Sequence, residues 1–502
     1  MKKILILLAF LSSVVRLQAN NIKVENVSYD KNTNRITFEL SWENAWRQTS
    51  NFHDAAWVFA KYRTVNQPRW QHVDIVPSST NAGGILETIE TNDRLGFYVR
   101  FNTDSLGHVL PTQVSFEPTD NSFGSLAGLF PDFQVFAIEM VYVPRGDFYV
   151  GAPITKNESD LFEDLVLYTY NNTSNISIRP YNPIHIVSEN QISSGPINII
   201  PYLGNKSIPA TFPKGYDSFY CMKQEISNDQ LVSFFNTIGT DPSRFYGLGF
   251  KIVGNNFVYN NVTLNQDSVD IIGTSTENGY VFTCKAGYEN HPAVMTPYTL
   301  INYLSWAGMA PMTELQYVKA CRGPLYPVWN EAASGIGFST ILRGNTWASA
   351  DTFFVDLNTP NERLKRHYPS PSTPKLRRCG YAADSSTNRI TANATFYGIL
   401  NMSDNVAEIT ISISDTNSSF AGYIGSPDSP PDLAASGIFE YIIPAYFSES
   451  GTGYSVIYYR GTEDGPLEYY DPNNLLSPTR DDGIVTNYFH YPIGGRGVRK
   501  PR

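Results

Sequence analysis

The sequence predicts an α+β protein in which an N-terminal antiparallel β-sandwich, residues 20–134, precedes a larger and more irregular domain, residues 135–502. Three observations lead to this prediction. Short aromatic strands with alternating apolar residues follow one another in the first part. Only two stretches of the second part show clear helical spacing. The 36 glycines and 32 prolines among 502 residues are typical of a loop-rich fold and not of a helical bundle.

The N-terminal strands are predicted at residues 36–42, 56–62, 70–76 and 95–101, where apolar and polar residues alternate between turn-rich segments. This alternation buries one face of each strand. We place the domain boundary at residues 131–132, before a predicted strand pair that opens the second domain.

Two helices are predicted in the second domain from their start signals. Ser227 or Asn228 caps an apolar pattern over residues 229–236, and Thr313 is a natural N-cap for a helix that follows it. The stretch 155–215 is rich in Asn and Ser, and we interpret it as a long surface insertion.

Residues 1–19 resemble a secretory signal peptide. Lys2 and Lys3 precede a short apolar run, which ends in the small-residue sequence of Leu17, Gln18 and Ala19. We therefore expect an exported protein of the periplasm, the outer membrane or the cell surface. No second apolar run of about 18 residues follows, so that no membrane span is predicted in the mature chain.

The charge balance excludes one class of partner. With 37 Lys and Arg against 47 Asp and Glu, the chain has a formal charge of −10 and lacks the clustered cations that nucleic acid requires. Aromatic residues make up 14% and charged residues only 17%, which favours a packed core over disorder.

Sequence-local catalytic motifs are missing. The chain has no G-x-S-x-G elbow, no phosphate-binding glycine loop, and no two histidines close enough to form a local metal pair. Its four cysteines are Cys221, Cys284, Cys321 and Cys379. They allow three disulfide pairings in an exported protein, but Cys221 and Cys321 have the surroundings of small buried apolar residues. Whether one disulfide forms stays open.

A loop at residues 401–408 carries several hard oxygen ligands of the kind that calcium prefers. Asp404, Asn405 and Glu408 are its candidate ligands. The same residue types are common in tight turns, so the spacing alone does not decide between the two interpretations.

Several motifs of the second domain follow one another in a recognisable order. Residues 139–151 read EMVYVPRGDFYVG, and residues 306–323 read WAGMAPMTELQYVKACRG. The remaining motifs lie at residues 219–230, 291–294, 397–409, 459–461 and 494–499. Together they resemble the formylglycine-generating-enzyme-like, or sulfatase-modifying-factor, domain.

The resemblance implies a compact, irregular α+β fold related to C-type lectins, here in a secreted variant with an added N-terminal β-domain. In that family the Asn and Glu of a G-N-x-W-E motif bind structural calcium. These positions are Asn405 and Glu408 here. Asp404 replaces the usual glycine, where it either adds a carboxylate or disturbs the turn.

The family's oxidase chemistry is not expected to carry over. The oxidase binds copper through two cysteines in the C-terminal part of its domain, whereas no cysteine follows Cys379 in this chain. A soft Cu(I) site needs such thiolates, so that no copper site is expected. Ala407 and Ile409 also replace the aromatic residues of the motif that contains Asn405.

Two classes of function follow from these observations. The first is a non-catalytic binding or assembly component, comparable to proteins of the type IX secretion and gliding apparatus. Its partner would be another envelope or secreted protein, with a glycan as the lesser alternative. The candidate binding surface, unless these tyrosines belong to the core, is Tyr454, Tyr458, Tyr459, Arg460, Tyr469 and Tyr470.

The second class is an enzyme of altered chemistry that keeps the family's cleft. Its polar residues would be Arg460, Glu463, Asp464, Arg480 and His490. Convergent titratable groups or a transition metal in a cleft would favour this class.

Overall fold

A computed structural model provides the structure of the chain. The residues it describes are 21–64, 67–78, 84–119, 132–150, 154–157, 168–169, 178–189, 211–238, 248, 250–253, 256–259, 271–276, 279–327, 333–335, 376–383, 387–403, 405–411, 420–422, 426–428, 457–460 and 493–501.

The N-terminal part consists of antiparallel strands, as predicted. The prediction at residues 70–76 corresponds to two short strands instead of one, because the chain turns between His72 and Ile75. The strands are β1 (Lys23–Asp30), β2 (Arg35–Thr49), β3 (Phe52–Thr64), β4 (Gln67–His72), β5 (Ile75–Pro77), β6 (Leu86–Glu90), β7 (Phe97–Phe101) and β8 (Ser105–Pro118).

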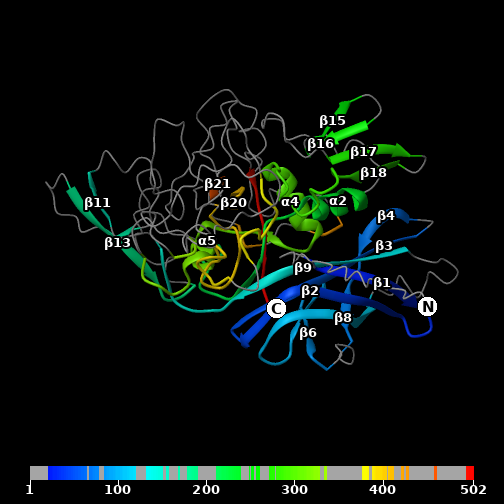
Figure 1. The fold of residues 1–502 in the computed structure, drawn as a ribbon, viewed down its shortest axis with the longest axis horizontal. Helices are drawn as coiled ribbons and strands as arrows, with labels where there is room; N and C mark the ends of the chain where they lie inside the picture. Colours follow the sequence, from blue (N-terminus) through cyan, green and yellow to red (C-terminus); the bar gives the residue numbers. More distant parts are fainter. Residues whose placement is uncertain are drawn as a thin grey trace, which may run out of the picture.

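These strands curl around an apolar core (Figure 1). Strands β1 and β8 pair with β2, and β5 pairs with β8. Strands β4 and β7 pair with β3, and the hairpin between β2 and β3 connects the two groups. Alternate residues of β2, from Ile36 to Trp42, point into this core and meet Ala56 and Val58 of β3. The alternation of apolar and polar residues in β2 therefore arises, as predicted, because one face of the strand is buried.

Strand β3 is buried on both faces. Ala56 and Val58 face the N-terminal core, whereas Trp57 and Phe59 face a second core on the opposite side. A strand covered on both sides is apolar throughout and not alternating, which the AAWVFA stretch of β3 reflects.

The same sheet continues across the predicted domain boundary. Strand β9 (Asp132–Val143) begins at that boundary and pairs with β3 from Arg63–Asp132 to Asp54–Val141. The sheet then extends through β14 (Phe219–Met222), β23 (Gly497–Arg499) and β19 (Ala310–Pro311). The two predicted domains thus share one sheet.

Three helices are described, and two of them confirm the predictions. Ser227 caps α2 (Asn228–Thr237) and Thr313 caps α5 (Glu314–Arg322), each with a complete capping box. Helix α4 (Pro297–Trp306) was not predicted. Its signals are Thr296 as N-cap and proline at the first helical position.

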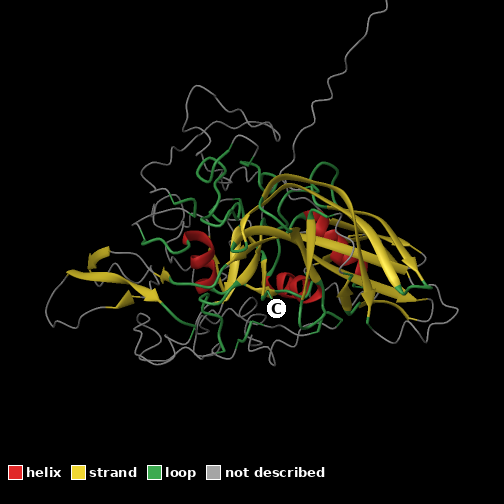
Figure 2. Ribbon diagram, turned by 90° about the horizontal axis from the view of Figure 1, so that it is seen from below, coloured by secondary structure: helices red, strands yellow, loops and turns green. Residues whose placement is uncertain are grey.

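Helices α2 and α4 cover the second face of the sheet, whereas α5 packs mainly beside Val141 and Val143 of β9, whose side chains point to the other face. Figures 1 and 2 show the three helices against the sheet. Phe234 of α2 and Trp306 of α4 contact each other, and Trp306 packs edge-on against Phe59 of β3. The molecule is thus mostly β, with a curled antiparallel sheet and three short helices among the described residues.

Smaller sheets complete the described part. The predicted insertion at 155–215 falls mainly outside the described residues. These sheets contain β10 (Phe148–Val150), β11 (Ile154–Asn157), β12 (Tyr168–Thr169), β13 (Ile178–Ile186), β15 (Phe250–Val253), β16 (Asn256–Tyr259), β17 (Ile271–Thr276), β18 (Gly279–Thr283), β20 (Ala407–Ile411), β21 (Ile457–Arg460) and β22 (Ile493–Gly494). Within the described residues, each helix is too short or too polar to cross a lipid bilayer.

Candidate functional site

The two described residues of the predicted calcium set bind other protein groups. Arg496 donates to Oε1 of Glu408 from Nε at 2.8 Å and from Nη2 at 2.6 Å, and both side chains are fully buried. Asn405 accepts a hydrogen bond from the backbone N–H of Arg377 and donates one to Oε1 of Glu225. Glu408, one of the predicted calcium ligands, is therefore paired with a permanent cation inside the protein.

This arrangement does not fit a calcium ion at Glu408. A guanidinium 2.6 Å from Oε1 places a positive charge close to where the ion would have to bind, and it already engages this oxygen. No three His, Cys, Asp or Glu side chains within the described ranges gather as a metal site. Asp404 lies outside these ranges. The structure thus shows Glu408 paired with Arg496, and calcium binding at this loop stays a prediction.

The predicted tyrosine surface is described only in part. Tyr458, Tyr459 and Arg460 lie in β21, which pairs with β20, and Arg460 is opposite Glu408. Outside the described residues lie Tyr454, Tyr469, Tyr470, Glu463, Asp464, Arg480 and His490.

All four cysteines are free thiols. Cys221 and Cys321 are fully buried, as predicted. Burial raises the pKa of Cys221 to about 12 and also raises the pKa of Cys321 and of Cys379. Because the thiolate is the reactive form, these buried thiols are unsuited to nucleophilic or metal-binding chemistry.

A buried polar cluster that the sequence analysis missed lies at the corner between β2 and β3. Lys223, which follows β14, donates to Oδ2 of Asp54 at 2.9 Å and lies 3.0 Å from Oε2 of Glu139. Its third contact is the backbone carbonyl of Asn44, at 2.9 Å. We call Asp54, Glu139 and Lys223 the corner triad. All three residues are at most 4% exposed.

The corner triad satisfies backbone groups that β2 leaves unpaired. The register of β2 shifts between Trp42 and Ala45, and Asn44 adopts a positive φ of 55° at this bulge. Lys223 binds the carbonyl of Asn44, and Oδ1 of Asp54 accepts the N–H of Trp46 at 2.9 Å. The charged side chains therefore stabilise the bend at which the sheet curls.

Burial also changes the protonation of the triad. Desolvation raises the pKa of Glu139 to about 7, against the opposing attraction of Lys223. Desolvation acts to lower the pKa of Lys223, but Asp54 and Glu139 outweigh it and raise that pKa above its ordinary value. Lys223 thus keeps its charge while Glu139 titrates near neutrality.

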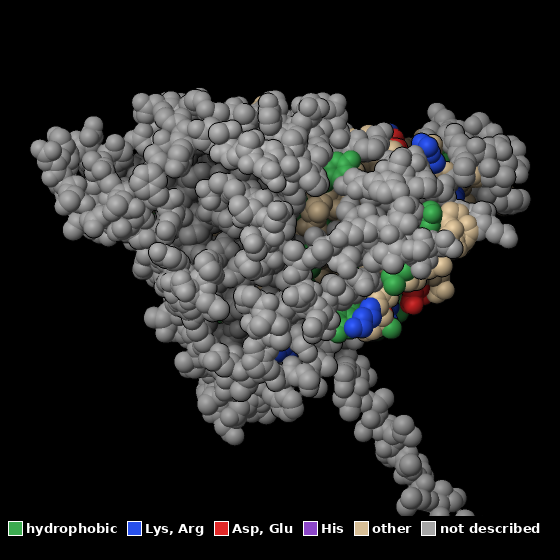
Figure 3. All heavy atoms as spheres, turned by 90° about the horizontal axis from the view of Figure 1, so that it is seen from above, with side chains coloured by type: hydrophobic (Ala, Val, Ile, Leu, Met, Phe, Trp, Pro, Cys, Tyr) green, Lys and Arg blue, Asp and Glu red, His purple; other side chains and the backbone are tan. Residues whose placement is uncertain are grey.

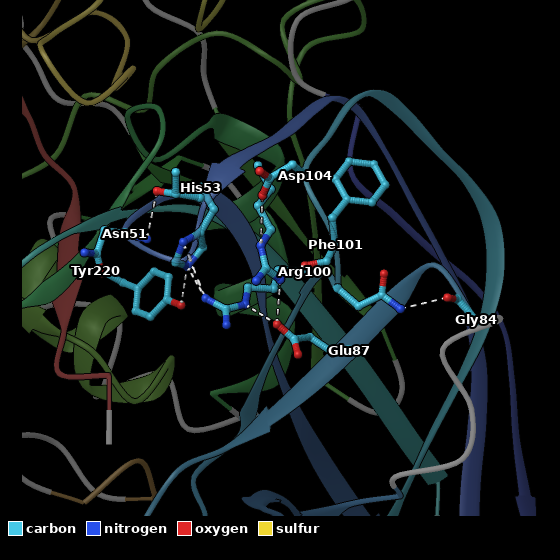
Figure 4. A network of polar contacts seen from close by, with 11 residues as sticks. Asn51, His53, Gly84, Glu87, Arg100, Phe101, Asp104 and Tyr220 are labelled. Carbon is cyan, nitrogen blue, oxygen red and sulfur yellow. Dashed lines mark hydrogen bonds and ion pairs between the residues drawn. The ribbon is translucent and has the colours of Figure 1, made fainter.

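A second network lies beside the triad and includes its neighbour on β3, His53 (Figure 4). Arg100 donates to Nε2 of His53 at 2.8 Å, and the hydroxyl of Tyr220 lies 2.9 Å from the same nitrogen. Because a guanidinium can only donate, Nε2 accepts from Arg100 and the ring proton lies on Nδ1. Desolvation, then Arg100 and Arg47, lower the pKa of His53 to about 3, so that the ring is neutral.

Two arginines meet on one carboxylate oxygen in this network. Arg47 and Arg100 lie 2.8 and 2.7 Å from Oε1 of Glu87, while Arg47 also donates to the carbonyl of Phe101. Asp104 is more distant, at 3.9 Å from Arg47. Figure 4 shows Glu87 of β6 and Arg100 of β7 close to His53 of β3, and Arg47 reaches Glu87 from β2. The charges compensate one another, so that this network does not form an open anion site.

The arginines in and just before β23 contact both the N-terminal strands and the segment that follows β14. Arg499 forms two hydrogen bonds with the carboxylate of Asp93, at 2.5 and 2.6 Å, and its guanidinium lies 3.9 Å from the ring centre of Trp57. Arg496 donates to the backbone carbonyls of Met222 and Lys223. The arginines of β23 and its preceding turn thus connect the N-terminal strands with the corner triad.

The polar groups of the corner serve mainly to hold the fold together. One signal in the sequence could have revealed them: His53 and Asp54 precede the apolar run of β3, and Lys223 follows the apolar strand β14. A charged residue next to a buried strand needs a partner inside the protein. The sequence does not reveal which residue that partner is.

The comparisons with known proteins do not assign a family. No family model matches the chain, and no curated protein matches it.

Proposed function

We propose that this chain is an exported, non-catalytic protein of the formylglycine-generating-enzyme-like type that binds or assembles with another envelope or secreted protein. The observation that carries the proposal is the buried ion pair between Glu408 and Arg496. It engages Glu408, a residue of the family's calcium motif, in holding the core together.

The buried thiols support the same proposal. Cys221, Cys321 and Cys379 are fully buried, and desolvation raises the pKa of each one. A protein of this fold whose thiols are buried in the core has no reactive cysteine to offer a substrate, which favours binding over catalysis.

The visible surface is compatible with a protein partner. On the face shown in Figure 3, the described side chains combine apolar groups with both signs of charge. Nucleic acid would require clustered cations, and the formal charge of the whole chain is −10.

The proposal is tested by crosslinking the tagged full-length chain in its native host and measuring the stoichiometry of what co-purifies. We expect one envelope or secreted protein in a fixed ratio. Replacing Tyr458 and Tyr459 with alanine should reduce its capture at least tenfold if β21 contributes the binding surface.

The matched control replaces Leu106 and Leu110 with alanine. These leucines on β8 are 87% and 71% exposed, and their removal should leave capture unchanged. A chain recovered as a monomer without a stoichiometric partner would contradict the proposal. Equal capture by both variants would keep the binding function but place its surface away from β21.

A further inference from the structure

We propose that the corner triad is a proton-sensitive latch, in which Glu139 gains and loses a proton and thereby strengthens or weakens the connection between the β2–β3 corner and strands β9 and β14. This inference goes beyond the proposed function and does not depend on the identity of a partner.

The number of charges carries the inference. Asp54 on β3 and Glu139 on β9 share the single ammonium group of Lys223, in a place where all three side chains are at most 4% exposed. With both carboxylates ionised, the triad would hold one uncompensated negative charge away from water, which is costly. One bound proton removes that charge.

The hydrogen bonds identify Glu139 as the carboxyl group that takes the proton. Asp54 has a donor at each oxygen, because Trp46 donates to Oδ1 and Lys223 to Oδ2. Glu139 has only Lys223 beside Oε2, and no partner is found for its Oε1 within the described part of the chain. The carboxylate with fewer donors is the poorer place for a negative charge.

The other charged groups near the triad either disfavour ionisation of Glu139 as well or are already paired with an opposite charge. Glu43 on β2 is a further carboxylate whose charge disfavours ionisation of Glu139. Arg496 binds the backbone carbonyl of Lys223, but its charge is paired with Glu408. His53 on β3 is neutral. Lys223 is thus the cation available to Glu139 at this corner.

The sign of the pH dependence follows from the two states of Glu139. The pKa of this carboxyl is near its ordinary value of 4.5 in the unfolded chain and about 7 in the folded chain. Stability from the neutral carboxyl is complete below the lower pKa and is lost as the pH rises through the upper one. Between them the unfolding equilibrium constant should rise by up to about tenfold per pH unit.

His53 contributes the opposite slope at acidic pH, because its folded pKa is about 3 against 6.5 for the unfolded chain. The informative quantity is therefore the difference between the wild type and Glu139→Gln, which removes the titrating group but keeps its shape. Urea unfolding of the full-length chain from pH 5 to pH 9 should show this difference growing toward pH 7 and remaining constant above it.

A matched control is Glu117→Gln, which neutralises a half-exposed carboxylate paired with Arg35 on the surface. Its unfolding should follow the pH profile of the wild type. A Glu139→Gln profile parallel to the wild type across this range would overturn the inference.

A second measurement does not require any variant to fold. Infrared difference spectra of the wild-type chain should show the C=O band of a protonated buried carboxyl at pH 6 that disappears by pH 9. The protection factors of the β9 and β14 amides, which correct for the base catalysis of exchange, should fall over the same range. A carboxyl that remains ionised at pH 6 would also overturn the proposal.

Discussion

At the scale of single residues, buried charges have the largest effects in this protein. Arg496, Glu408, Lys223, Asp54 and Glu139 are all at most 4% exposed and are paired across long distances in the sequence. Removing one partner leaves the other as a buried and uncompensated charge. The cost is then the desolvation of that charge and not the modest net value of the pair.

Arg496→Met should therefore destabilise the fold by about 3–5 kcal/mol, because it removes the guanidinium that binds Oε1 of the fully buried Glu408. The double variant with Glu408→Gln should recover part of this loss. The control, Arg35→Met, removes an exposed pair and should cost at most about 1 kcal/mol. Urea unfolding monitored by tryptophan fluorescence measures all three, and equal losses at both sites would contradict a structural role for Arg496.

At the scale of elements, each described helix begins directly after a Ser or Thr whose side chain caps its first turn. Thr313 accepts a hydrogen bond from the N–H of Gln316, which accepts in turn from the N–H of Thr313. The same hydroxyl donates to the carbonyl of Pro213 at 2.9 Å. One side chain thus satisfies the start of α5 and fastens a segment distant in the sequence.

Thr313→Val keeps the branched shape but removes both hydrogen bonds, and we expect it to destabilise the protein by about 1–3 kcal/mol. Thr313→Ser keeps the hydroxyl and loses one methyl group, so that it should cost about 1 kcal/mol or less. Chemical denaturation of the two variants compares them directly. If the serine variant lost as much as the valine variant, packing of the methyl group and not capping would be decisive.

At the scale of the whole molecule, the continuous sheet determines how the chain unfolds. Strand β3 pairs with β9 along most of its length, and its two faces belong to two different cores. Residues 21–131 therefore lack both the neighbouring strand and the helices that cover Trp57 and Phe59. We expect this fragment not to fold cooperatively, because each uncovered aromatic side chain forgoes about 2–3 kcal/mol of burial.

Circular dichroism of the isolated fragment during heating tests this expectation, with the full-length chain as reference. The full chain should give coincident transitions by far-UV and near-UV signals. A fragment with its own sharp transition would instead support an independently folding N-terminal domain, as the sequence predicts.

Much of the β-rich architecture could be predicted from local patterns. Alternating apolar residues predict the strands of the first part, and N-cap residues predict helices α2 and α5. Both signals can be recognised because they depend only on neighbours in the sequence. Helix α4 was missed although Thr296 and Pro297 mark its start. Its sequence, PYTLINYLSW, contains no charged residue and so lacks the charged face that identifies a surface helix.

The sequence by itself determined the antiparallel strands of the first part, the two capped helices and the burial of Cys221 and Cys321, whereas the structure is mostly β where the sequence predicts α+β. Only the tertiary structure decided that β9 continues the N-terminal sheet, that Glu408 pairs with Arg496 and that Lys223 joins Asp54 to Glu139. The physical reason is that a buried charge must find an opposite charge in space. The identity of that partner depends on which distant segments the sheet brings together.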